Sequence, residues 1–168
     1  MNMTGPEDRS AGMSLVVKTV ARWLKGVIFL FGLYIVLYGH LTPGGGFAGG
    51  VICAAAFILL TLAYGARGAY RHLPRPAAEK LDSLGALAFL ALAWLGVWAG
   101  QVFFRNFIGT SPEHYFRLPS GGIIIPCNLA IAVKVTSSLF LVFIMLSVLH
   151  VVVTGEGGRR VARRRHEP

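Results

Sequence analysis

The stretch GHLTPGGGFAGG, Gly39 to Gly50, separates two long apolar runs. A plain connection between two helices needs less backbone freedom, because Pro43 stops a helix and the glycines permit backbone angles that other residues resist. At membrane depth, irregular backbone is tolerated only where protein or a water-filled cavity surrounds it. Two interpretations stay open: a tight hairpin at the membrane surface, or an element that lines an ion path or admits a neighbouring helix.

The apolar runs beyond this stretch predict membrane-spanning helices. Of the 168 residues, 55% are hydrophobic and 14% are charged, whereas soluble domains carry about 25% charged residues. A helix needs about 20 apolar residues to cross the bilayer, and no strand-like alternation typical of a barrel is present. We therefore expect an all-α, polytopic membrane protein with four transmembrane helices: Val20 to Tyr38, Gly49 to Ala66, Leu84 to Phe104 and Leu129 to Val153.

The basic residues predict the orientation of these spans. The net charge is +9, with 16 lysines and arginines. Arg105 and Arg117 lie on one side, Lys134 lies within the last span, and the remaining thirteen fall on the other side if the chain crosses four times. This positive-inside pattern places both termini in the cytoplasm of a multi-pass cell-membrane protein.

The chain divides into a polar N-terminal segment (1–17), a four-helix membrane domain (18–153) and a basic cytoplasmic tail (154–168). Attraction to anionic lipid headgroups explains such a tail. RNA binding is the alternative, but no aromatic-basic recognition motif accompanies the arginines, so we expect the lipid bilayer and no nucleic acid as its partner.

The ionisable residues disfavour an autonomous enzyme or carrier. All seven acidic residues lie outside or at the edge of the expected spans, whereas a self-contained ion-coupled carrier usually needs an intramembrane carboxylate. The sequence has no catalytic arrangement, phosphate-binding loop or metal-ligand spacing. We expect no catalytic residue, metal site or cofactor in this chain.

Lys134 is the only charged residue inside an expected span, and such a charge costs about 2.5–3.5 kcal/mol at the bilayer centre. Its long stem would allow the ammonium to reach the headgroups. Against this simple explanation, helical spacing places Ala130, Ser137 and Ser138 beside it, a small polar face that suits contact with protein. Both explanations stay open.

The stretch GHLTPGGGFAGGVICAAAFILLTLAYG closely resembles the signature of the MnhB/MrpB family, whose members are membrane subunits of multisubunit Na+/H+ antiporters. The later LPSGGIIIPCNLAIAVKV is similar to the family's region before its last helix, so the resemblance covers roughly Val16 to Val153. The matching motif residues are Gly39, His40, Pro43, Gly44, Gly45, Gly46, Phe47, Gly49 and Gly50.

The resemblance implies a non-catalytic subunit of a multisubunit cation/proton antiporter, or of an antiporter-like module in a redox-driven complex of the membrane-bound hydrogenase type. Its partners would be other antiporter or complex I-like membrane subunits, with a hydrogenase or other redox module in the second case. Asn128 and Lys134 replace the acidic pattern that antiporter members often carry in the last helix, which favours the redox-coupled version. The alternatives are a purely structural bridge between ion-translocating subunits and an independent small carrier or channel.

An ion path through the chain would draw on its few polar residues near the spans. Lys134 is the first candidate, and His40 and Asn128 are expected near the same outer surface, where each is either part of a hydrated path or structural. The full set of candidates is Lys134, His40, Asn128, Ser137 and Ser138.

Overall fold

The computed structural model describes residues 13–100, 102–108, 118–154 and 158–163. Four helices dominate it, and each is long and apolar enough to cross a membrane. This confirms the prediction of a four-helix, multi-pass membrane protein. The helices are α1 (Leu15–Tyr38), α2 (Gly46–His72), α3 (Arg75–Gly100) and α4 (Ile124–Val148).

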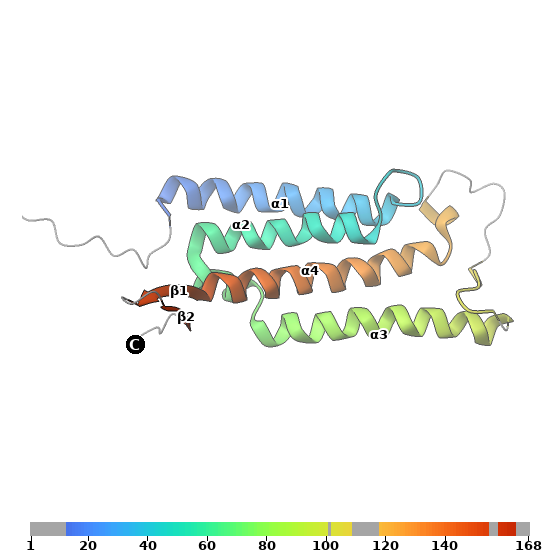
Figure 1. Cartoon of the computed structure of the whole chain (residues 1–168). Helices are drawn as coiled ribbons and strands as arrows, with labels where there is room; N and C mark the ends of the chain where they lie inside the picture. The colour runs from blue at the N-terminus through green and yellow to red at the C-terminus, as the bar shows by residue number, and fades with distance from the viewer. Residues whose placement is uncertain (1–12, 101, 109–117, 155–157, 164–168) are drawn as a thin grey trace, which may run out of the picture.

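The helices lie side by side in the order α1, α2, α4, α3, so that α2 and α4 occupy the middle (Figure 1). α4 packs against both α2 and α3, and α1 packs mainly on α2 with a smaller contact with α4. The turn between α2 and α3 lies at the end of the bundle where α1 begins and α4 finishes, and the connection between α1 and α2 lies at the opposite end. Among the described helices, α1 and α3 therefore lie at the two ends of the row.

Aromatic contacts connect α1, α2 and α4 across the row. The ring centroid of Phe57 in α2 lies 6.0 Å from that of Phe29 in α1 and 5.9 Å from that of Phe140 in α4, and both pairs meet edge to face. Near the end of α2, Phe140 also joins a buried cluster with Leu73, Ala78 and Ile144. In lipid, such dispersion contacts and interhelical hydrogen bonds hold helices together, because the hydrophobic effect adds little.

Helices α3 and α4 begin earlier than the apolar runs indicated. α3 begins at Arg75 and not at Leu84, and α4 begins at Ile124 and not at Leu129. Each carries a proline in its first turn, where the missing N–H has no helical partner to lose. Arg75 also pairs with Glu79 one turn later at 2.8 Å, so the polar start of α3 is itself helical.

The far end of α3 also differs from the prediction. The helix ends at Gly100, four residues before the expected Phe104, whose φ of 59° turns the chain back. The amide N–H of Phe104 then reaches the carbonyl of Ala93 at 3.4 Å. Two glycines at the end of α3 accommodate this returning segment: the backbone of Phe104 packs on Gly96, and the side chain of Arg105 on Gly100.

The last predicted span ends too late. α4 stops at Val148, and an antiparallel hairpin follows, made of β1 (Leu149–Thr154) and β2 (Gly158–Arg163), in which Leu149 pairs with Arg163. Because α4 begins at Ile124, its 25 residues already suffice to cross the bilayer. The β-branched valines of β1 favour an extended strand.

Candidate functional site

The glycine-rich connection folds as a compact turn between α1 and α2. The amide N–H groups of Leu41 and Thr42 donate to the carbonyl of Tyr38 at 2.9 and 3.0 Å. Gly45 adopts a φ of +122°, a conformation that a residue with a Cβ rarely takes. Gly39 lies directly against the backbone of Gly45, where any side chain would clash.

The next glycines bring three helices together. A Cβ at Gly50 would lie 2.9 Å from the Cβ of Val135 and 3.0 Å from the carbonyl oxygen of Ala132, both in α4. A Cβ at Gly49 would lie 2.7 Å from the carbonyl oxygen of Gly32 in α1. The hydroxyl of Thr136 donates to the carbonyl of Gly50 at 3.0 Å. The glycines thus allow α2 to approach α4 on one side and α1 on the other.

His40 and Asn128, the two polar residues predicted near this turn, both contact glycines at this end of the bundle. The ring of His40 packs against Gly121, in a 3-10 turn (Leu118–Gly121) that precedes α4. Half-buried Asn128 lies against Gly45 and Gly46, where its side-chain oxygen would be 3.5 Å from a Cβ at Gly45. Both residues therefore sit at the α1–α2 end of the bundle.

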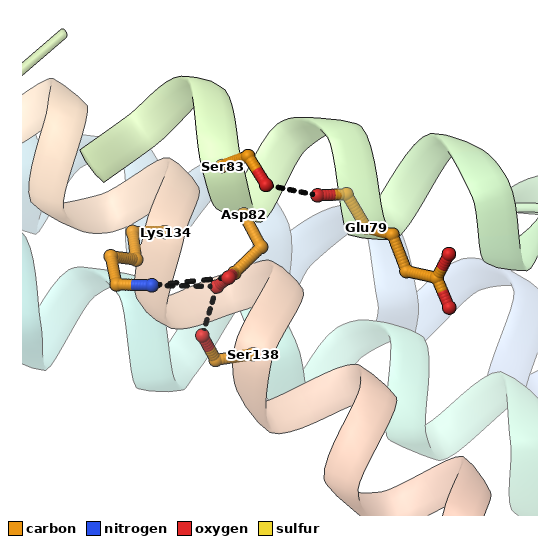
Figure 2. A network of polar contacts seen from close by, with 5 residues as sticks. All are labelled: Glu79, Asp82, Ser83, Lys134 and Ser138. Atoms are coloured by element: carbon orange, nitrogen blue, oxygen red, sulfur yellow. Dashed lines mark hydrogen bonds and ion pairs between the residues drawn. The ribbon is translucent and has the colours of Figure 1, made fainter. Parts of the chain in front are cut away.

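A second polar group links α3 to α4 (Figure 2). The ammonium of Lys134 donates to both carboxylate oxygens of Asp82, at 3.0 and 3.1 Å. The hydroxyl of Ser138, one turn along α4, donates to the Oδ1 atom of the same carboxylate. Glu79 points away from this group, and its carbonyl accepts a hydrogen bond from Ser83 at 3.1 Å.

Asp82, which the sequence placed at the edge of the third expected span, lies inside helix α3. By length and composition, the pair falls within the candidate spans Arg75–Gly100 and Ile124–Ser147. At 1.5 Å per residue, Lys134 is roughly 15 Å from the start of α4 and roughly 21 Å from its end. Among the described residues, the ammonium of Lys134 thus contacts the carboxylate of Asp82. This differs from the simple explanation in which the ammonium reaches the lipid headgroups.

Gly85 permits this contact between the two helices. A Cβ at this position would lie 2.8 Å from the backbone nitrogen of Lys134 and 2.9 Å from the carbonyl oxygen of Ala130. The absence of a side chain on α3 thus brings the two backbones close enough for Asp82 to reach across. Gly85 is a positioning residue for the pair.

The ion pair opens onto an apolar groove of about 410 Å³ between α3 and α4. The side chains of Lys134 and Asp82 are 44% and 28% exposed. Phe47, in the first turn of α2, is 68% exposed and forms one edge of the groove. The lining residues are Phe47, Gly85, Ala86, Phe89, Ile131, Lys134, Val135, Ser138 and Leu139.

The five predicted ion-path residues thus divide by position. Lys134 and Ser138 share the Asp82 group, whereas Asn128 and His40 lie at the turn, and Ser137 is 2% exposed inside the bundle. Sequence reasoning missed Asp82, although a lysine in a span calls for a carboxylate. Asp82 stands two residues before the expected span, closer than any other acidic residue stands to a span.

Two proteins from other organisms are similar in sequence to most of this chain. A protein from Staphylococcus haemolyticus, named for antiporter subunit mnhB2, is 33% identical over 140 residues, which cover 83% of this chain and 89% of that protein. An uncharacterized protein from Methanocaldococcus jannaschii is 34% identical over 142 residues, 82% of this chain and 54% of its own length. This chain thus spans about half of that archaeal relative.

A solved structure shares the fold. A chain in the structure of the membrane-bound sulfane sulfur reductase, an archaeal respiratory membrane complex, matches with a TM-score of 0.66 and 36% identity, over 79% of this chain and 58% of that one. The family described as domains related to the MnhB subunit of Na+/H+ antiporter matches residues 16–154. The glycine turn and the four packed helices are therefore those of a multi-pass membrane protein that belongs to the MnhB family.

Proposed function

We propose that this chain is a non-catalytic integral-membrane subunit of a multisubunit cation/proton antiporter, or of an antiporter-like module in a redox-driven ion-pumping complex. Membership of the MnhB family and the relative named for an antiporter subunit support the first part. The 36% identical chain in a respiratory membrane complex supports the redox-coupled version. Other membrane subunits are its partners in either case.

The observation that carries a role in ion translocation is the Asp82–Lys134 pair. It lies within two candidate spans and faces a groove, with nearly half of the lysine side chain exposed. The pair presents the ammonium of Lys134 to the groove: at about 8 Å and an effective dielectric constant near 20, a unit charge contributes about 2 kcal/mol, which the carboxylate of Asp82 beside it partly offsets. Lys134 would thus bias the charge of an ion-carrying group on a neighbouring subunit.

The structural bridge remains the second candidate, and one observation favours it. The described helices form an open row with α1 and α3 at its ends, as a spacer between larger subunits would require (Figure 1). In that case the ion pair only fastens α3 to α4, and its charge has no role in transport.

Substitution of Lys134 in the assembled complex separates these two roles. Lys134→Met keeps the length and removes the charge, whereas Lys134→Arg keeps the charge and changes the shape. We expect the Met variant to lower cation/proton exchange in membrane vesicles by about tenfold per assembled complex, and the Arg variant to lower it less. Unchanged exchange in the Met variant, at normal subunit composition, would assign the chain to the structural role.

A further inference from the structure

We propose that a transmembrane helix of another subunit docks in the α3–α4 groove and presents a neutral oxygen acceptor, from Ser, Thr, Asn or Gln, to the ammonium of Lys134. This inference rests on the proposed function, because it identifies the kind of partner that the same site takes. It starts from an imbalance of hydrogen bonds at the ion pair.

The carboxylate of Asp82 is well supplied with donors, whereas the ammonium of Lys134 is not. Asp82 accepts from Lys134 at both oxygens and from Ser138 at one. Among the described residues, the ammonium donates to Asp82 alone, although it carries three N–H groups. The contacts with Asp82 use at most two of these N–H groups, and the side chain is 44% exposed and lines the groove. The unmet requirement is for an acceptor.

Lipid does not meet this requirement. Acyl chains offer no acceptor, so an N–H left against them costs free energy. A water in the groove would have polar partners only at the ion pair and Ser138, because the other lining residues are glycine, alanine and larger apolar residues. An apolar helix with a single polar side chain would fit the apolar lining of the groove and would also offer an acceptor to the ammonium of Lys134.

Charge balance selects a neutral acceptor. Asp82 already neutralises Lys134, so a second carboxylate would leave a net negative charge within the membrane. The backbone carbonyls of a helix are occupied by its own hydrogen bonds, which leaves side-chain oxygens. Exposed Phe47 at the groove edge gives the docking helix an aromatic contact beside the polar one.

Site-specific photo-crosslinking in the assembled complex tests the occupant. A diazirine analogue of leucine replaces Leu139, which lines the groove, or Leu146, which is exposed on the same helix but outside it. We expect position 139, and not 146, to cross-link to a transmembrane peptide of another subunit that contains Ser, Thr, Asn or Gln. Adducts only with lipid, adducts with a second copy of this chain, or equal labelling of that peptide from both positions would overturn the proposal.

Filling the groove provides an independent readout. Ala86→Trp, on the groove wall, should reduce co-purification of the cross-linked partner about tenfold. Leu87→Trp, exposed on α3 outside the groove, is the matched control and should leave it unchanged. Equal losses in the two variants, or no loss in either, would overturn the groove as the docking surface.

The acceptor itself is tested by a double-mutant cycle. Replacing the partner's polar residue by alanine should weaken co-purification with the unmodified chain, but add nothing to a Lys134→Met variant. Additive losses would overturn the hydrogen bond. Failure of the proposed function has a different signature, because membranes that lack this chain would then keep their cation/proton exchange whatever is cross-linked.

Discussion

Asp82 and Lys134 neutralise each other within two candidate spans, where a lone charge would be costly. The two side chains come from helices that meet at Gly85, and Ser138 adds a third hydrogen bond. Each charge therefore stabilises the bundle only while the other is present. Removal of one partner leaves the other unpaired, and removal of both leaves a neutral contact between α3 and α4.

The first prediction follows from this mutual dependence. Asp82→Asn leaves Lys134 unpaired and should destabilise the complex by about 2.5–3.5 kcal/mol, the cost of a lone charge in a span. The double variant Asp82→Asn/Lys134→Met should recover most of that loss. The thermal midpoint of the detergent-solubilised complex measures both.

Glu79→Gln is the matched control for this cycle. Glu79 lies one turn before Asp82 and pairs with exposed Arg75, a contact that contributes less than about 1 kcal/mol. Its loss should hardly move the thermal midpoint. A double variant as unstable as the sum of its single variants would show that the two charges act independently.

A second prediction concerns two glycines in different surroundings. Gly50→Ala places a methyl group 2.9 Å from the Cβ of Val135 and should lower stability by about 1–3 kcal/mol through overpacking. Gly26→Ala meets nothing within 4 Å and should be neutral or stabilise α1 by up to about 1 kcal/mol. Melting curves of the complex would contradict this packing account if both variants behaved alike.

At the residue scale, the sequence identified the unusual residues but not their contacts. Lys134 and Ser138 were recognised from charge and helical spacing, which depend only on one helix. Asp82 was not, because its partner is 52 residues away and the local polarity of Glu79, Lys80 and Ser83 placed it outside the span. Thr136 and Gly85 likewise act through contacts between helices that hydropathy cannot reveal.

At the scale of elements, all four helices were predicted from hydropathy, while several of their ends were not. An apolar run indicates which residues face lipid, but it does not indicate where the helix begins or ends. A helix can continue into polar surroundings, as α3 does at Arg75. The strand β1 was absorbed into the last apolar run, because Val151, Val152 and Val153 are as apolar as a span. Periodicity alone does not separate a short apolar strand from the end of a helix.

The order of the elements leads to a prediction of sidedness. The connection between α1 and α2 and the turn between α2 and α3 lie at opposite ends of the bundle (Figure 1). With basic residues retained in the cytoplasm, a cysteine at Leu41 should react with an impermeant maleimide on intact cells, and one at Arg75 only after permeabilisation. Native Cys53 and Cys127 are first replaced by alanine. Labelling of both positions from one side would refute this topology.

At the scale of the whole molecule, the four described helices form an open row with α1 and α3 at its ends. α4 contacts the other three helices, whereas α3 packs mainly on α4 alone. An ion path bounded by this chain would therefore need another subunit to close it. This agrees with a subunit that acts in a complex.

The corresponding prediction concerns the isolated chain. Purified alone and reconstituted into liposomes, it should show no cation/proton exchange above that of protein-free vesicles, because its ion pair faces an open groove and not a closed path. A pH-sensitive dye trapped in the vesicles measures the exchange after a cation jump. Robust exchange would instead support an independent carrier.

The central position of α4 also has a consequence for biosynthesis. α3 packs mainly on α4, yet Asp82 emerges from the ribosome 52 residues before Lys134. At the usual rate of synthesis, this carboxylate waits roughly 3 to 10 seconds for its partner. A chain terminated between α3 and α4 would keep an unpaired acid in the membrane and lack the main neighbour of α3. We therefore expect quality-control proteases to degrade chains that lack α4, because the bundle is complete only when its last helix has been made.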